Sequence, residues 1–146
     1  MRWFFKLVRS AHFAVFRLSG GRVGASIAGM PMLLLATKGR RSGRLHNVPL
    51  GYLLEQDSYV VIASYRGSPK HPAWYLNLRA EPNALMQVGS DKIKVIAKTV
   101  DSDSREQLWN RLAEKTPIYK RFQDRTSRQI PMVYLTPVDL DTKAPH

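Results

Sequence analysis

Apolar residues follow two different periods along this chain of 146 residues. In residues 1–18 they recur every three or four positions, and the cations Arg2, Lys6 and Arg9 fall mainly on the other side, which predicts a basic amphipathic helix. Charges interrupt the segment too often for a membrane span, and no uninterrupted apolar region follows the start as it would in a secretory signal. Two roles are open: the helix either covers one face of a sheet, or it rests on anionic lipid or closes over a pocket.

Short apolar runs separated by turn residues predict strands in the rest of the chain. Four glycines between residues 20 and 29 make a loose connection, so we divide the chain into a helix with a Gly-rich connection (1–30) and one compact domain (31–146). Strands are predicted at residues 32–37, 47–54, 59–64, 84–88, 93–100 and 132–136. Helices are predicted from Pro72 to Pro82, from a cap at Ser102 or Asp103 to about residue 115, and over 118–126. Strands and helices do not alternate, so the pattern indicates an α+β fold, mainly antiparallel β, as a small barrel or roll.

The composition favours a globular protein with an anionic partner. Lys and Arg number 23 against 11 Asp and Glu, and the net charge of +12 suits nucleic acid, membrane lipid or a polyanionic cofactor. The absence of cysteine excludes disulfides, thiolate metal sites and thiol nucleophiles, and it fits a cytoplasmic protein. The four histidines show no ligand spacing, so we predict no metal site.

The turn at residues 37–43, TKGRRSG, carries the most information about function. Gly39 and Gly43 are expected to take positive φ and to let the backbone approach a ligand. Charge and hydroxyl groups come from Lys38, Arg40, Arg41, Thr37 and Ser42. The turn therefore predicts a site for a phosphate or carboxylate tail, with a solvated hairpin tip as the alternative. It is not a phosphate-binding P-loop, because it joins strand to strand and lacks the G-x-x-x-x-G-K-[ST] spacing.

The loop at residues 63–72 leads from a strand end into the start of a helix. It brings backbone donors and the side chains of Ser64 and Lys70 to one place, as a planar heteroaromatic ligand requires. The alternative is that its prolines only stiffen a connection and that Trp74 and Leu78 belong to the core.

A second candidate lies in residues 117–131, where Tyr119 and Phe122 share one helix face. They either wall a flat apolar pocket or pack in the core. The chain shows no Ser-His-Asp order, paired-carboxylate pattern or dinucleotide fingerprint, so hydrolysis and Rossmann-type redox chemistry have no support.

Together these segments resemble the deazaflavin-dependent nitroreductase family, the actinobacterial split-barrel enzymes that use coenzyme F420. The resemblance covers residues 31–137 and rests on TKGRRSG, Asn47–Leu50, the stretch 69–78 (PKHPAWYLNL) followed by Pro82, Gln87–Gly89, and Asp124–Thr126 ahead of Ile130-Pro131. It implies a split β-barrel of the FMN-binding type, with an N-terminal amphipathic helix and further helices packed on the barrel. The deazaflavin lies in a groove of such a barrel, and basic residues bind its phosphate and oligoglutamate tail.

The resemblance also implies a role for individual residues. Those expected to bind the cofactor are Lys38, Arg40, Arg41 and Ser42 at the tail, Asn47, Val48 and Pro49 along the groove, and Ala63, Ser64, Gly67, Lys70, Trp74 and Asn77 around the ring. The catalytic candidates are Ser64 and Tyr119, and the substrate is expected to meet Tyr119, Phe122 and Tyr65. This chain departs from the family pattern at Tyr65-Arg66, where Lys-Gly or Gly-Gly is more usual, and at Thr116 and Phe122, where tyrosines are common. These departures bear on nitro-prodrug activity and not on cofactor binding.

The implied reaction is the transfer of a hydride from reduced F420 to an electron-poor acceptor. The acceptor is a quinone or a nitroaromatic compound, and a quinone is favoured, because the apolar N-terminal helix and the late aromatic segment suit a lipid-like substrate better than a sugar or a nucleotide. We also expect peripheral contact with anionic lipid at the inner face of the cell membrane. The oligomeric state is left open, and a dimer is one possibility. The alternatives are a non-catalytic F420, lipid or fatty-acid binding protein of the same barrel and an FMN-dependent relative. A nucleic-acid-binding protein is disfavoured, since no recognised motif of that class occurs.

Overall fold

The structure is a computed structural model that describes residues 26–27 and 29–138. Its strands are β1 (Ser26–Ile27), β2 (Met30–Lys38), β3 (Leu45–Glu55), β4 (Ser58–Ile62), β5 (Asn83–Val88), β6 (Asp91–Thr99) and β7 (Met132–Pro137). Its helices are a 3-10 turn, η1 (Tyr65–Gly67), and the α-helices α2 (Ala73–Ala80), α3 (Ser102–Lys115) and α4 (Ile118–Asp124). The predicted helix over residues 1–18 lies outside the described residues, and the division at residue 30 stays a prediction.

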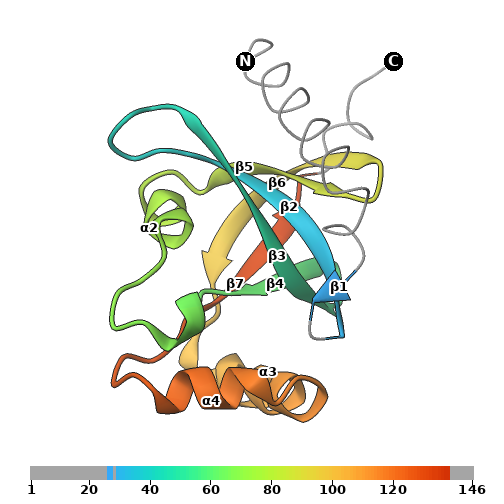
Figure 1. Ribbon diagram of the computed structural model, residues 1–146. Coiled ribbons are helices and arrows are strands. Elements are labelled where there is room, and N and C mark those ends of the chain that lie inside the picture. The colour runs from blue at the N-terminus through green and yellow to red at the C-terminus, as the bar shows by residue number, and fades with distance from the viewer. Residues whose placement is uncertain (1–25, 28, 139–146) are drawn as a thin grey trace.

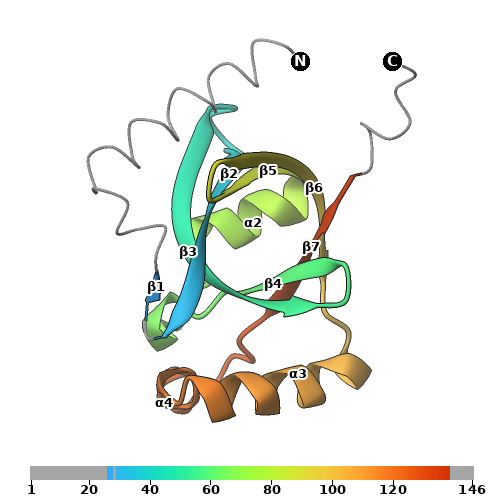
Figure 2. The same cartoon turned by 90° about the vertical axis from the view of Figure 1, so that its right-hand side faces the viewer.

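The strands form one antiparallel sheet that closes on itself into a barrel (Figures 1 and 2). Its order is β1-β2-β3-β4-β7-β6-β5, and β2 closes it by pairing with β5 as well as with β3. Leu35 of β2, for example, is opposite Val48 on one side and Met86 on the other. The prediction of a mainly antiparallel barrel is confirmed. One detail differs: the end of the connection predicted to be loose forms the short strand β1, paired with Met30 and Pro31.

Alternation along the strands builds a core inside the barrel. Leu33 and Leu35 of β2 point inward and share this core with Trp74, Tyr75 and Leu78 of α2. Figure 2, which looks along the barrel, shows α2 lying across the space that the strands enclose. Each of these large side chains contributes about 1.5–3 kcal/mol by leaving water. The core-packing alternative for Trp74 and Leu78 is therefore correct, although Trp74 has a second role described below.

A second core lies outside the barrel, under α3 and α4. Val60 and Ile62 of β4 face it, while Val61 between them faces the inner core, so this strand is apolar on both sides. Leu108 and Leu112 of α3 cover it. Figures 1 and 2 show α3 and α4 together below the barrel, against its outer wall, and Figure 1 shows the β2–β3 hairpin at the upper left, away from them.

The start of α3 corrects one prediction. The helix is capped by Asp101, whose carboxylate accepts a hydrogen bond of 2.8 Å from the Ser104 N–H, and not by Ser102 or Asp103. All three residue types cap helices well, so the composition alone does not choose among them. The choice follows from the backbone: Asp101 is extended and ends the β6 connection, whereas Ser102 and Asp103 already belong to the first turn.

Candidate active site

The turn of the β2–β3 hairpin is stabilised by hydrogen bonds of its own backbone and of the Ser42 side chain. The Gly39 N–H donates to the Arg44 carbonyl at 2.7 Å, and the Arg44 N–H donates to Ser42 Oγ at 3.1 Å. Gly43 takes a φ of +73°, as predicted. Gly39 does not take a positive φ, so that prediction is wrong for it. A Cβ at position 39 would lie 2.6 Å from Ser42 Oγ and 2.7 Å from His46 Nε2, so a larger residue there would require these two exposed side chains to move.

The hairpin carries exposed cations and is linked to α2 by hydrogen bonds of Asn77. The first acidic residue of the whole chain is Glu55, so no carboxylate in the hairpin neutralises Lys38, Arg40, Arg41 or Arg44. The buried Asn77 accepts from the backbone N–H of Arg40 at 3.1 Å and from its Nη1 at 3.3 Å, and it donates to Thr37 Oγ1 at 3.1 Å. Asn77, predicted to lie near the ring, thus orients the cationic turn against the barrel.

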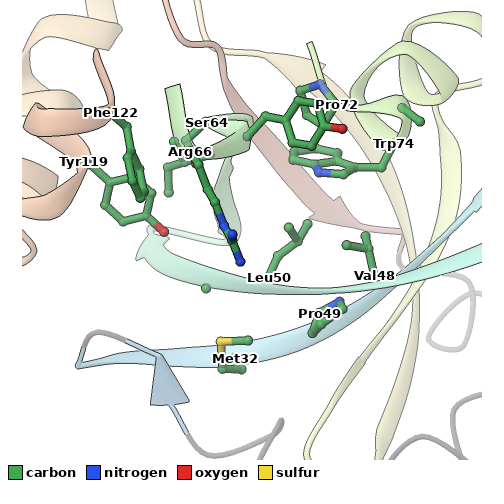
Figure 3. Close-up of a pocket in the computed structure, with 14 residues that line it drawn as sticks. Met32, Val48, Pro49, Leu50, Ser64, Arg66, Pro72, Trp74, Tyr119 and Phe122 are labelled. Carbon is green, nitrogen blue, oxygen red and sulfur yellow. The ribbon is translucent and has the colours of Figure 1, made fainter. Parts of the chain in front are cut away.

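A pocket of about 560 Å³ opens between β3, the end of β4, η1, the start of α2 and α4 (Figure 3). Its walls are mostly apolar, and its few polar groups include Ser64, Arg66 and Tyr119, as is typical of small-molecule sites. It is lined by Met32, Val48, Pro49, Leu50, Gly51, Ile62, Ser64, Tyr65, Arg66, Pro72, Ala73, Trp74, Tyr119 and Phe122.

The structure brings seven of the predicted site residues together in this lining: Val48, Pro49, Ser64, Trp74, Tyr65, Tyr119 and Phe122. The others do not line it. Lys38, Arg40, Arg41 and Ser42 belong to the hairpin region, and Asn47, Ala63, Gly67, Lys70 and Asn77 lie on neighbouring strand, loop and helix positions. The site is therefore an apolar pocket along the middle of β3, with a separate cationic hairpin turn just before the start of that strand.

Tyr119 and Phe122 form the aromatic wall of the pocket. Their ring centroids are 5.8 Å apart and the rings are nearly perpendicular, at 87°, which is a favourable edge-to-face arrangement. Both rings also pack on the outer core, so the pocket-wall role and the core-packing role, given as alternatives from the sequence, are both correct. Burial raises the pKa of the Tyr119 hydroxyl above its usual value of 10, so it stays protonated and can donate a hydrogen bond at neutral pH.

The turn η1 places Ser64 next to this wall. Tyr65, Arg66 and Gly67 are all in the left-handed region, with φ of 46°, 56° and 81°, although only the last is a glycine. A Cβ on Gly67 would lie 2.5 Å from the carbonyl oxygen of Phe122, so glycine is needed for α4 to approach the turn. Ser64 and the aromatic pair are thereby held at a fixed spacing.

Arg128 stabilises this loop through hydrogen bonds, and no role was predicted for it. Its Nε donates to the Ser68 carbonyl at 2.8 Å, its Nη2 to the Ser64 carbonyl at 2.7 Å, and its Nη1 to the Ala63 carbonyl at 3.2 Å. The planar fork of a guanidinium is suited to several carbonyls in one plane. No local pattern marks this arginine among the other cations of residues 120–128, because the partners of its guanidinium are 57 or more residues away.

Comparisons with known proteins identify the family of this chain. The model of the F420H(2)-dependent quinone reductase family matches residues 7–137. The chain belongs to this family. It is similar to an F420H(2)-dependent quinone reductase of Mycobacterium tuberculosis, with 38% identity over 129 residues that cover 86% of this chain and 87% of the relative.

Two solved structures are also similar to this member of the quinone reductase family. One, titled as an F420-H2 dependent reductase, has a TM-score of 0.65 and 35% identity, and the match covers 72% of this chain and 93% of that one. The other, titled as a domain-swapped dimer, has a TM-score of 0.66 and 31% identity, with 90% and 98% covered. The resemblance, the split barrel and the F420H2-dependent oxidoreductase function predicted from the sequence are confirmed.

Two features are absent from the described residues, 26–27 and 29–138. No helix there is both long and apolar enough to cross a membrane. No group of three or more histidines and carboxylates there could hold a metal ion.

His71 completes the hydrogen bonds around Arg128. Since the guanidinium can only donate, His71 Nδ1 accepts from Arg128 Nη1 at 3.2 Å, which leaves the neutral ring with its proton on Nε2. The ring meets the Tyr75 ring edge-on at 4.9 Å. Burial, followed by the charges of Arg128 and Arg79, lowers the pKa of His71 below its ordinary value of 6.5.

We predict that His71 makes the stability of this quinone reductase family member depend on pH. Above about pH 6.5 the ring is neutral in the folded and unfolded states, and its contribution is present in full. As the pH falls below this value, the unfolded chain takes up a proton before the folded one does, so the free energy of unfolding decreases. Urea unfolding between about pH 5.5 and 8 measures this slope, which should flatten in His71→Gln, because the amide oxygen can still accept from Arg128 but does not titrate. Equal slopes in the two proteins would contradict the prediction.

Proposed function

We propose that this protein holds the ring of reduced F420 in the pocket, binds the acidic tail of the cofactor at the hairpin, and reduces a quinone. One observation carries the proposal: a single pocket joins Val48, Ser64 and Trp74, expected at the ring, to Tyr119 and Phe122, expected at the acceptor. Cofactor and acceptor would then be in direct contact in an apolar space. Such proximity is the main contribution that a protein makes to hydride transfer.

The residues present fit the cofactor. The turn at residues 37–44 carries four exposed cations and no carboxylate of its own, and this suits a phosphate and an oligoglutamate tail better than a neutral ligand. The Oδ1 atom of Asn47 is buried and has no hydrogen-bond partner among the described residues, as expected for a group whose partner is a ligand. When bound, reduced F420 supplies the hydride from C5 of its ring.

The side chains of the pocket supply position, shielding and a proton donor. Val48 and Trp74 offer apolar surface to a flat ring, and the Ser64 hydroxyl offers one polar contact beside it. The Tyr119 hydroxyl, protonated because burial raises its pKa, can donate to a carbonyl oxygen of the acceptor. Nitroaromatic compounds present oxygens of similar character, so we propose them as a second acceptor class.

The hairpin should determine cofactor affinity. Replacing Arg41, which makes no side-chain hydrogen bond within the described part of the chain, by Ala should weaken F420 binding by on the order of tenfold. The double variant Arg40→Ala, Arg41→Ala should bind more weakly still, and affinity should fall with salt. Fluorescence titration with oxidised F420 and with FMN measures both, and Lys92→Ala, on an exposed cation of β6, is the matched control. Equal affinity for F420 and FMN would count against the assignment.

The aromatic wall should determine the rate of quinone reduction. Tyr119→Ala removes one side of the pocket and should slow the reaction by a factor on the order of ten or more, about 1.4 kcal/mol, while F420 affinity stays nearly unchanged. Tyr119→Phe keeps the ring and removes only the hydroxyl, so it separates stacking from proton donation. Stopped-flow decay of the absorbance of reduced F420, with and without a menaquinone-like quinone, gives the rates. Tight F420 binding without acceptor-dependent oxidation in the parent protein would instead favour a storage or carrier role.

Peripheral contact with anionic membrane is a further proposal, and it rests on the sequence of residues 1–18, outside the described residues. Each of the four cations in this segment is expected to contribute about 1 kcal/mol near an anionic surface. Changing Arg2, Lys6, Arg9 and Arg17 to Gln should therefore abolish co-sedimentation with vesicles that contain anionic lipid. Binding that survives these changes would mean that the segment packs on the protein.

A further inference from the structure

Arg66 is the one charged side chain among the residues that line the described pocket. The rest of the lining consists of apolar, aromatic and hydroxyl-bearing residues and glycine. Figure 3 shows the Arg66 side chain running from η1 into the pocket, with its guanidinium near Leu50 and on the side of Tyr119 and Phe122. The side chain is exposed, and within residues 26–27 and 29–138 its guanidinium makes no hydrogen bond or ion pair. Its five N–H donors are therefore free to bind a ligand.

The backbone makes this arginine costly. Arg66 has a φ of 56°, in the left-handed region that glycine adopts with little strain and other residues avoid. Within the described residues, the hydrogen bond of Arg66 is made by its carbonyl oxygen, which accepts from Arg125 Nη1 at 3.3 Å. Any residue type at this position would have that oxygen. The fold thus gives no reason for an arginine here. Strained residues held in place at a pocket point to function.

The electrostatics of the pocket suggest what this cation does. A quinone that accepts a hydride gains two electrons and one proton, so one of its oxygens becomes anionic until a second proton arrives from the Tyr119 hydroxyl, which water then reprotonates. Oxidation of the cofactor by loss of the same hydride balances the step. Once a bound acceptor excludes water from the apolar pocket, a cation beside it stabilises a developing negative charge better than water does.

We propose that Arg66 binds a carbonyl oxygen of the acceptor and stabilises the negative charge that develops there, which makes it a specificity-determining residue of this chain. The inference rests on the proposed function and deepens it. It predicts a preference for acceptors whose oxygens carry negative charge, either in the ground state or during reduction. The cofactor, whose acidic tail is assigned to the hairpin, should not depend on Arg66.

The test compares four variants of the full-length protein. Arg66→Met removes the charge but keeps much of the length, Arg66→Lys keeps a charge without the planar fork, and Arg66→Gly also relieves the left-handed strain. Lys120→Met is the matched control, since it removes an exposed cation beside Tyr119 that does not line the pocket. Three quantities are measured: the dissociation constant for F420, kcat/KM for a naphthoquinone, and the melting temperature. A calorimetric titration without cofactor adds the affinities for 2-hydroxy-1,4-naphthoquinone, an anion at neutral pH, and for neutral 1,4-naphthoquinone.

We expect kcat/KM to fall on the order of tenfold or more in Arg66→Met and Arg66→Gly and less in Arg66→Lys, with F420 affinity unchanged. Arg66→Gly should melt no lower than the parent protein, so its lost rate cannot come from unfolding. The preference for the anionic over the neutral naphthoquinone should disappear in Arg66→Met and persist in Lys120→Met.

Two results would overturn the inference. The first is that kcat/KM and the anion preference are both unchanged in Arg66→Met. The second is that this variant loses F420 affinity as strongly as it loses rate, which would assign the residue to the cofactor. If the parent protein neither binds F420 nor reduces quinones, the proposed function fails. The cofactor-free titration still decides on Arg66 in that case, because a lost anion preference in Arg66→Met supports its role and an unchanged preference overturns it.

Discussion

The hydrogen bonds of Arg128 are the interaction on which the site depends most. This one side chain donates to the carbonyls of Ala63, Ser64 and Ser68, and so fixes the loop that follows β4. The loop contains the left-handed turn η1, which a chain would not keep without support, because two of its three residues are not glycine. Burial lowers the pKa of the Arg128 guanidinium, but arginine stays charged in proteins, so the hydrogen bonds to carbonyl oxygens remain charge-assisted.

The barrel supplies the frame for this loop, and β2 is its central strand. Because β2 pairs with both β3 and β5, it closes the barrel and also carries the cationic hairpin at its end. Asn77 then links that hairpin to α2, whose other side chains fill the inner core. The cationic hairpin and the pocket are thus connected through rigid elements, which suits the proposed binding of a long cofactor with a flat ring and an acidic tail.

Membership of the F420H(2)-dependent quinone reductase family accounts for this arrangement and leaves one feature of the chain to explain. The hairpin, the apolar groove and the aromatic wall are what an enzyme that places a deazaflavin against a flat acceptor requires. A free arginine in a left-handed turn is not required by the barrel or by the loop. Arg66 therefore points to the part of the reaction that distinguishes this chain, the choice of acceptor.

The sequence by itself determined the elements and the chemistry that is local. Alternating apolar residues located six strands, Pro72 and Pro82 bounded α2, and TKGRRSG combined cations with turn residues at one hairpin. These features depend on neighbours a few positions apart, and the periods of strand and helix make such neighbours visible in a sequence. The motifs also sufficed for the family, because several of them occur in a fixed order.

The tertiary structure decided which of these groups meet. Trp74 and Tyr119 line one pocket, although they belong to different helices and both also pack on a core. Arg128 reaches carbonyls 60 or more positions away, and Asn77 supports a hairpin 37 residues earlier in the chain. A hydrogen bond to a backbone carbonyl cannot be recognised from the residue type of the acceptor, since every residue has a carbonyl. A left-handed φ at a non-glycine residue cannot be recognised from the sequence either. Barrel closure alone brings such groups into contact, so they could not be read from local pattern.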